Sequence, residues 1–275
     1  YCAKYGIRAP VLDRSHNSKS NYYSFQAKLE KRFSNGWALG QAFTWGKAID
    51  RSWGYVQNNW CRECSKSVAD FDVAVVYRFW HIAELPFGPG KRFLPDAKGF
   101  TKQIVSGWQL SGIYSWRSGY AFTPVVGNQS RFNAYWFAAP VWRPDRLSVG
   151  KLDSPNQNRW FDVSAFSIPA DYTFGTSGRN ILRSPGEFVP DIDVSKSFPL
   201  TESKMLKFRA SMLNGFNIAN LGNPVTAIDN PLAGGIFNVS TLMRRVEFGL
   251  HLYFSGGRTG KGAAKPGRRR LHQLH

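Results

Sequence analysis

Seven segments of this chain alternate apolar and polar residues, which is the period-2 pattern of β-strands that have one apolar and one polar face. In the clearest segment, Phe25 and Leu29 lie on one side and Lys28 on the other. Asn35-Gly36 follows soon after and predicts a tight hairpin, because both turn positions need a positive φ. The predicted strands cover Asn21–Phe33, Trp37–Lys47, Val73–Phe87, Trp108–Arg117, Asp191–Phe198, Leu206–Asn217 and Arg245–Phe254.

The connections between these strands alternate between short and long. The shorter ones are Asn35-Gly36, Gly88–Ser106 and Pro199–Lys204, and the long ones are Arg51–Phe71, Gly119–Pro190 and Ala219–Met243. If the strands run up and down, all shorter turns fall at one end and all long loops at the other, as in outer-membrane barrels. A tilted strand needs about 9–11 residues to cross a bilayer, whereas soluble strands centre on about 5–6. The pattern predicts an all-β fold, an antiparallel transmembrane β-barrel segment with long extracellular loops.

Composition is compatible with that fold. Aromatic residues make up 15% of the chain, which suits the aromatic girdles of a barrel. The sequence contains no run of about 18 apolar residues, so it predicts no transmembrane helix. No secretory signal is recognisable, and the chain begins at Tyr1 rather than Met, so we expect a fragment or a processed product.

The charge of the chain is strongly positive, at +18. Residues 255–275 contribute +6 and no acid, and their Gly-rich, aperiodic sequence predicts a disordered basic tail after a barrel segment at 1–254. The remaining +12 could attract anionic ligands, lipopolysaccharide phosphates or nucleic acid. The more ordinary interpretation is solvated charge on the loops and the barrel interior.

Two cysteines, Cys61 and Cys64, form a CxxC motif in the first long loop. A structural zinc site needs four ligands, and no second CxxC or paired His lies nearby. A redox motif would need a βαβ setting, which is absent. We therefore expect either a local disulfide between Cys61 and Cys64 or two unpaired thiols, and no metal.

Several stretches, taken together and in order, resemble the barrel of Oar-like TonB-dependent outer-membrane receptors. They are "NYYSFQAKLEKRFSNG" (21–36), "FTWGKAID" (43–50), "ELPFGPGKRF" (84–93), "GWQLSGIYSWRSGYAFTP" (107–124), "RWFDVSAF" (159–166), "FGTSGRNILRSPG" (174–186), "FPLTESKMLKFRASMLNGFN" (198–217) and "VEFGLHLYF" (246–254). The resemblance implies a barrel of about 22 strands with an N-terminal plug, and this chain contains no plug. It would thus supply the C-terminal seven strands, or eight if Tyr120–Val126 also forms one. An independent closed barrel of eight strands stays open as an alternative.

The same resemblance implies a location and partners. Members of that family tend to end on an aromatic residue that resembles a signal for the outer-membrane insertion machinery, and Phe254 occupies this place, although 21 residues follow it. The implied location is the bacterial outer membrane, in contact with its lipid. The implied partners are the missing plug and N-terminal barrel part, the TonB complex acting only through that plug, and an unknown transported ligand.

The sequence shows no catalytic constellation, so we expect neither an enzyme nor a cofactor. Asp70 and Asp72 flank Phe71 at the start of a predicted strand, where paired carboxylates are usually solvated or salt-bridged. The candidate ligand-binding residues are loop aromatics and arginines at the barrel mouth, which could stack on a ligand or attract an anion. They are Trp53, Tyr55, Trp60, Arg131, Tyr135, Trp136, Trp142 and Arg143. The ordinary alternative is that the aromatics pack against one another and the arginines are solvated.

The function that these observations favour is TonB-dependent uptake of a substrate. One alternative is a structural or adhesive surface protein, in which the barrel is an anchor and Gly119–Pro190 the exposed module. Another is a soluble β-rich nucleic-acid-binding protein that uses the basic tail. No complementary layer is visible to cover its apolar faces, which argues against the soluble alternative.

Overall fold

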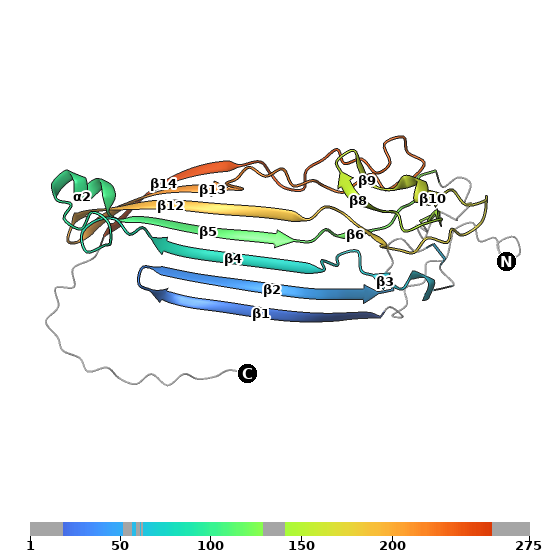
Figure 1. Cartoon of the computed structure of the whole chain (residues 1–275), viewed down its shortest axis with the longest axis horizontal. Helices are drawn as coiled ribbons and strands as arrows, with labels where there is room; N and C mark the ends of the chain where they lie inside the picture. The colour runs from blue at the N-terminus through green and yellow to red at the C-terminus, as the bar shows by residue number, and fades with distance from the viewer. Residues whose placement is uncertain (1–18, 52–56, 59–60, 62, 129–140, 255–275) are drawn as a thin grey trace, which may run out of the picture.

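The computed structural model describes residues 19–51, 57–58, 61, 63–128 and 141–254. Its main feature is one antiparallel sheet, here called the wall, in which seven long strands pair in the order β1-β2-β4-β5-β12-β13-β14 (Figure 1). Each long strand therefore lies beside the next one along the chain. Their bounds are Ser20–Ser34 (β1), Trp37–Asp50 (β2), Val75–Glu84 (β4), Trp108–Arg117 (β5), Glu187–Thr201 (β12), Lys204–Leu213 (β13) and Arg245–Phe254 (β14). All seven predicted strands are confirmed.

The prediction of a possible eighth wall strand at Tyr120–Val126 was wrong. Only Ala121–Phe122 (β6) is a strand there, and it pairs with Leu182–Arg183 (β11) in a separate two-stranded sheet. β5 ends at Arg117, but the β6–β11 pair keeps the register of the β5–β12 pair, so this segment prolongs an existing strand pair beyond an interruption at Gly119 and adds no eighth wall strand.

β12 also begins earlier than predicted, at Glu187, and includes Pro190. Proline lacks an N–H and is tolerated only where a ladder hydrogen bond is not required of it. Pro190 meets this condition because it lies beyond the segment of β12 that pairs with β13, and its carbonyl accepts the N–H of Gly215.

The shorter turns and the long loops lie at opposite ends of the wall, as predicted (Figure 1). Asn35 and Gly36 have φ values of 54° and 84°, which confirms the tight hairpin. The Gly88–Ser106 connection at the same end contains a short helix, α2 (Gly99–Val105). Within the described residues, no helix is long and apolar enough to cross a membrane.

One face of the wall, here called the apolar face, presents large apolar side chains in cross-strand pairs. Examples are Phe25 opposite Trp45, Phe43 opposite Tyr77 and Phe208 opposite Leu250. Phe25 is 60% exposed, Trp45 62% and Leu250 67%. A soluble protein rarely leaves so large an apolar surface uncovered, so this face is suited to lipid.

The opposite, polar face is lined by small residues on β2 and by ion pairs farther along the wall. Gly40 lies under the indole of Trp80, and a Cβ there would come within 2.8 Å of Trp80 Cζ2. Asp193 pairs with Arg209 and also accepts the hydroxyl of Ser211 at 2.7 Å. The small residues of β2 thus make room for large side chains from the next strand.

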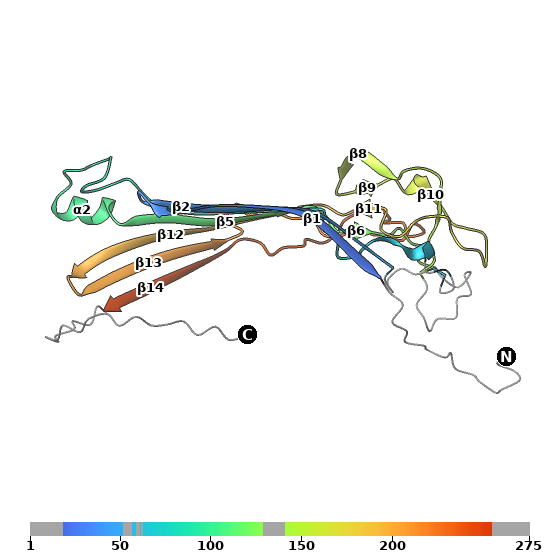
Figure 2. The same ribbon diagram turned by 90° about the horizontal axis from the view of Figure 1, so that it is seen from below.

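The wall is curved but open. Figure 2 shows β12, β13 and β14 bending away from the plane of β1, β2 and β5. Among the described residues, β1 pairs only with β2 and β14 only with β13, so both outer strands have a free edge. The structure therefore shows neither strand closing the sheet into an eight-stranded barrel.

The packed core lies in the long loops rather than in the wall. Phe122, Phe161, Ala165, Phe166 and Leu182 form its main cluster, and Val126 packs with Trp142 in a second one. The remaining elements here are η1 (Glu63–Ser65), β3 (Ser67–Val68), β7 (Asp145–Arg146), β8 (Lys151–Asn156), β9 (Arg159–Phe161), η4 (Val163–Ala165) and β10 (Phe166–Ser167). We call this packed loop region the mouth. Its packed side chains lie at one end of the wall.

Candidate functional site

A buried arginine, Arg179, makes the first set of contacts that hold the mouth together. The Arg179 side chain, fully buried, pairs with Asp50 at the end of β2 and with Asp70 of the first long loop, the latter at 3.0 Å from Nη1. Its Nε donates to the carbonyl of Ser65 at 3.1 Å. Asn180 adds a bond from Nδ2 to the carbonyl of Val68 at 2.7 Å. One turn of the second loop is thereby tied to both the wall and the first loop.

A second arginine repeats this arrangement four residues later. Arg183 Nη2 lies 2.5 Å from the buried carboxylate of Asp72, and Nη1 donates to the carbonyl of Gly119 at 3.0 Å. The other carboxylate oxygen of Asp72 accepts the N–H of Ala48 on β2 at 2.6 Å. Asp70 and Asp72 are thus both salt-bridged, which confirms the structural interpretation of this pair.

The third long loop joins through Asp229. Its carboxylate accepts the N–H groups of Gly127 and Asn128, both at 2.7 Å. Desolvation acts to raise the pKa of Asp229, but the backbone N–H groups of Asn128 and Gly127 outweigh it, so the pKa lies below its usual value. All three long loops are therefore fastened to one another at the mouth.

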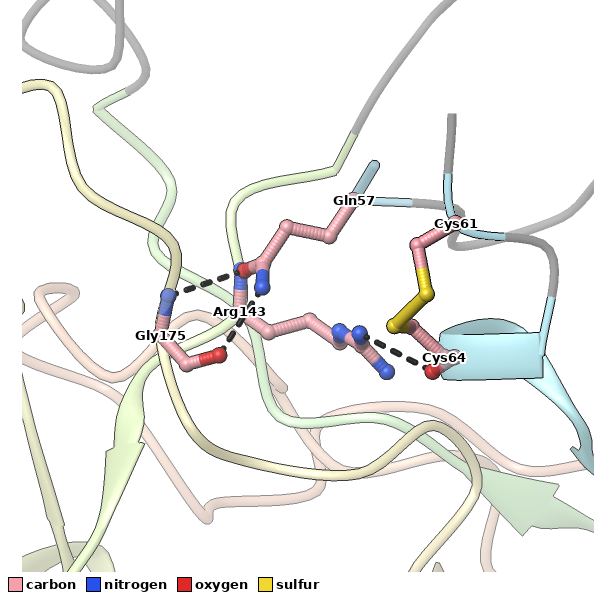
Figure 3. The surroundings of a disulfide bond; sticks show 5 residues. All are labelled: Gln57, Cys61, Cys64, Arg143 and Gly175. Carbon is pink, nitrogen blue, oxygen red and sulfur yellow. Dashed lines mark hydrogen bonds between the residues drawn. A yellow bond between two sulfur atoms is a disulfide. The ribbon is translucent and has the colours of Figure 1, made fainter. Parts of the chain in front are cut away.

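Gln57 and Arg143 connect the first and second loops around the disulfide (Figure 3). Gln57 Oε1 accepts the N–H groups of Arg143 and Gly175, at 2.9 and 3.2 Å, and its Nε2 donates to the carbonyl of Gly175 at 2.8 Å. The Arg143 guanidinium points toward the Cys61–Cys64 turn, where Nη2 lies 3.4 Å from the carbonyl of Cys64. A single amide side chain thus satisfies three backbone groups of the second loop.

Cys61 and Cys64 are joined in a disulfide, one of the two states that the sequence left open. Replacing both with serine is expected to destabilise the first loop by about 2 kcal/mol, because the chain-entropy effect of so short a ring is small. Limited proteolysis of the double variant should then show faster cleavage in that loop with an intact wall. Cys2→Ser is the matched control, since Cys2 is outside this bond. Equal cleavage of both variants would contradict the prediction.

The structure describes two of the predicted ligand-binding residues, and both are buried. Trp142 is fully buried, packs against Val126 and donates from its indole N–H to the carbonyl of Thr173 at 3.0 Å. Arg143 is 4% exposed. The remaining candidates lie outside the described residues: Trp53, Tyr55, Trp60, Arg131, Tyr135 and Trp136. The basic tail, 255–275, also lies outside them. Trp142 is therefore packed against aliphatic side chains, and the packing of the loop aromatics against one another stays a prediction.

Sequence reasoning did not find Arg179, Arg183 or Gln57. Arg179 and Arg183 stand in the quoted stretch 174–186, but their partners Asp50, Asp70 and Asp72 lie more than a hundred positions away in the chain. The only signal within the sequence was two acids two positions apart, Asp70 and Asp72, and two arginines four positions apart, and nothing local pairs them.

A cavity of about 660 Å³ opens where the mouth meets the first two wall strands. Its lining includes Ser24 and Gly46 of the wall, Lys47, and Asn180 and Arg183 of the second loop. Tyr23, Phe25 and Trp45 line it as well, so its wall side combines large aromatic with small residues, and Lys47 and Arg183 border it. Within the described ranges, no group of three His, Cys, Asp or Glu side chains could hold a metal ion.

An antiparallel wall with a lipid-suited face, shorter turns at one end and a packed mouth at the other defines a membrane β-barrel protein. The family model described as the outer membrane beta barrel domain matches residues 4–247, and the chain belongs to this family. It is accordingly a protein of the bacterial outer membrane. No match was found among curated proteins or among solved structures. This membership rules out the soluble nucleic-acid-binding alternative.

Proposed function

We propose that this chain forms part of the wall and the mouth of a TonB-dependent uptake receptor similar to the Oar-like receptors. The observation that carries the proposal is the open wall with free edges on β1 and β14. Free strand edges cannot persist in lipid, because their N–H and C=O groups have no other hydrogen-bond partners there. Each edge therefore needs a partner strand, and in our proposal further strands pair with both edges, so that the complete barrel is wider than seven strands.

A wide barrel encloses a lumen that must be closed when no substrate passes, and 22-stranded outer-membrane transporters close it with a plug. In our proposal the plug and the other wall strands come from outside this sequence, and the TonB complex acts through that plug. The mouth binds the substrate without catalysing a reaction. The insertion machinery recognises β14, which ends on Phe254.

The edges provide a direct test. The native cysteines are first replaced by serine. Ala27 of β1 is then replaced by cysteine together with one residue of β14, which is Phe248, Leu250 or Leu252, and each double variant is oxidised in outer membranes. We expect no cross-link within one chain, because other strands separate the two edges. An intrachain cross-link in any pair would show a small closed barrel. Energised uptake by this chain without a plug would also contradict the proposal.

A second candidate, a structural or adhesive surface protein, is favoured by one observation: the second long loop has its own packed core and small sheets. Such a loop could present a rigid binding surface outside the cell. Deleting residues 120–185 distinguishes the two functions. Loss of cell adhesion with unchanged uptake would favour the adhesive protein, and loss of uptake the receptor.

A further inference from the structure

Arg143 carries a buried charge whose hydrogen bonds are incomplete. The residue is 4% exposed, and its Nε and Nη1 atoms are buried without a hydrogen-bond partner. Its remaining polar contact is the one from Nη2 to the carbonyl of Cys64, at 3.4 Å. A guanidinium has five N–H donors and stays protonated in proteins, so most of its donors have no acceptor here.

Within the part of the chain that the structure describes, no carboxylate forms an ion pair with Arg143. Asp50 and Asp70 pair with Arg179, and Glu63 pairs with Arg51. The loop segments 52–62 and 129–140, which include the residues outside the described ranges nearest to it in sequence, contain no Asp or Glu. Desolvation and the neighbouring charge of Arg179 both lower the pKa of Arg143. Arg143 therefore has a neighbouring guanidinium and, among the described residues, no carboxylate in ion-pair distance of its own.

An isolated buried charge is costly unless a counter-charge and hydrogen bonds compensate it. We propose that Arg143 binds a compact monovalent anion, a halide or a carboxylate group, between the Cys61–Cys64 turn and the Gly175 segment. The anion accepts the N–H groups of Nε and Nη1, which have no other acceptor, and gives the guanidinium a direct counter-charge. This inference does not depend on TonB-dependent uptake.

The local packing explains why the anion must be compact. Gln57 holds Arg143 and Gly175 together through its side-chain amide (Figure 3). A Cβ at Gly175 would overlap the carbonyl oxygen of Arg143 and lie 2.6 Å from that of Pro144. The backbones of the two segments are therefore in close contact, and because the Arg143 side chain is itself almost fully buried, we expect a compact anion but not a bulky sulfonate to reach its guanidinium.

The test uses the full chain, refolded in detergent micelles, and follows the thermal midpoint of unfolding by tryptophan fluorescence. Potassium isethionate, a bulky sulfonate, is replaced by potassium chloride or potassium acetate at constant ionic strength. We expect the wild-type midpoint to rise saturably, by roughly 3 °C or more at ten times the dissociation constant. A response to chloride but not acetate identifies a halide site, and the converse a carboxylate site.

Two variants separate specific binding from general salt effects. Arg143→Met should show no saturable rise and should match or exceed the wild type in isethionate alone, because it removes the uncompensated charge. Arg159→Gln removes an exposed arginine of the same loop and should respond like the wild type. Equal responses in all three proteins, or none in the wild type, would overturn the proposal. If Arg143→Met does not fold, wild-type crystals grown in bromide and in acetate decide: an anomalous bromide peak or acetate density within hydrogen-bond distance of Nε or Nη1 supports the site, and the absence of both refutes it.

Discussion

Replacing Arg179 with methionine is expected to lower the free energy of unfolding of the mouth by about 3–5 kcal/mol, the cost typical of removing one partner from a buried ion pair. The substitution leaves the carboxylates of Asp50 and Asp70 without their counter-charge and the carbonyl of Ser65 without its donor. Chemical denaturation followed by tryptophan fluorescence measures the loss, and limited proteolysis should locate it in the two long loops. The wall should persist, because its ladder of strand pairs does not involve this side chain.

Arg159→Met is the matched control for that experiment. Arg159 belongs to the same loop, but its side chain is 58% exposed in a pair with Asp162, and exposed pairs contribute at most about 1 kcal/mol. Combining Arg179→Met with Asp50→Asn and Asp70→Asn should recover part of the loss, since the unpaired charges are then removed. Equal effects of the two arginine substitutions would show that the buried network does not hold the mouth together.

Gly119→Ala is the second substitution with a large expected effect, about 3 kcal/mol or more. A Cβ at this position would overlap the carbonyl oxygen of Ser184 and lie 2.7 Å from that of Pro185. Both obstacles are backbone, so no side-chain rotation relieves them. The bond from the N–H of Ser184 to the carbonyl of Tyr120, and the adjoining β6–β11 pair, should break. Denaturant unfolding and proteolysis near residue 120 measure the effect.

Gly90→Ala provides the comparison. Gly90 has a φ of +72° but nothing within 4 Å of an added Cβ, so alanine there costs only the left-handed strain, about 1–2 kcal/mol. The difference between the two variants isolates the steric overlap at Gly119. A Gly119→Ala protein as stable as Gly90→Ala would mean that the second loop shifts at little cost.

The wall was predictable because its information is local. Alternation over about ten residues places Phe25 and Trp45 on one face, whatever the rest of the chain does, and Asn35-Gly36 specifies its turn through backbone conformation alone. The prediction was wrong at Tyr120–Val126, where an apolar stretch indicated a possible eighth wall strand. There the chain continues the β5–β12 register past Gly119 and pairs with β11, so it adds no new strand, and no local pattern reveals that pairing.

The mouth could not be predicted in the same way, because its contacts join residues far apart in the chain. Arg179 meets Asp50 across 129 positions, and Gln57 meets Gly175 across 118. Irregular loops have no period, so the sequence does not indicate which arginine will be buried and which solvated. Trp142 and Arg143 were candidates for an exposed binding surface and are instead buried.

The sequence by itself determined the fold class, the seven wall strands, their faces and the separation of shorter turns from long loops, since each follows from strand periodicity and turn chemistry. Only the tertiary structure decided which acids pair with Arg179 and Arg183, that Cys61 and Cys64 are bonded, and that Arg143 is buried beside another cation. Those outcomes depend on burial and on distances between loops, which arise only when the folded wall brings the loops together at one end.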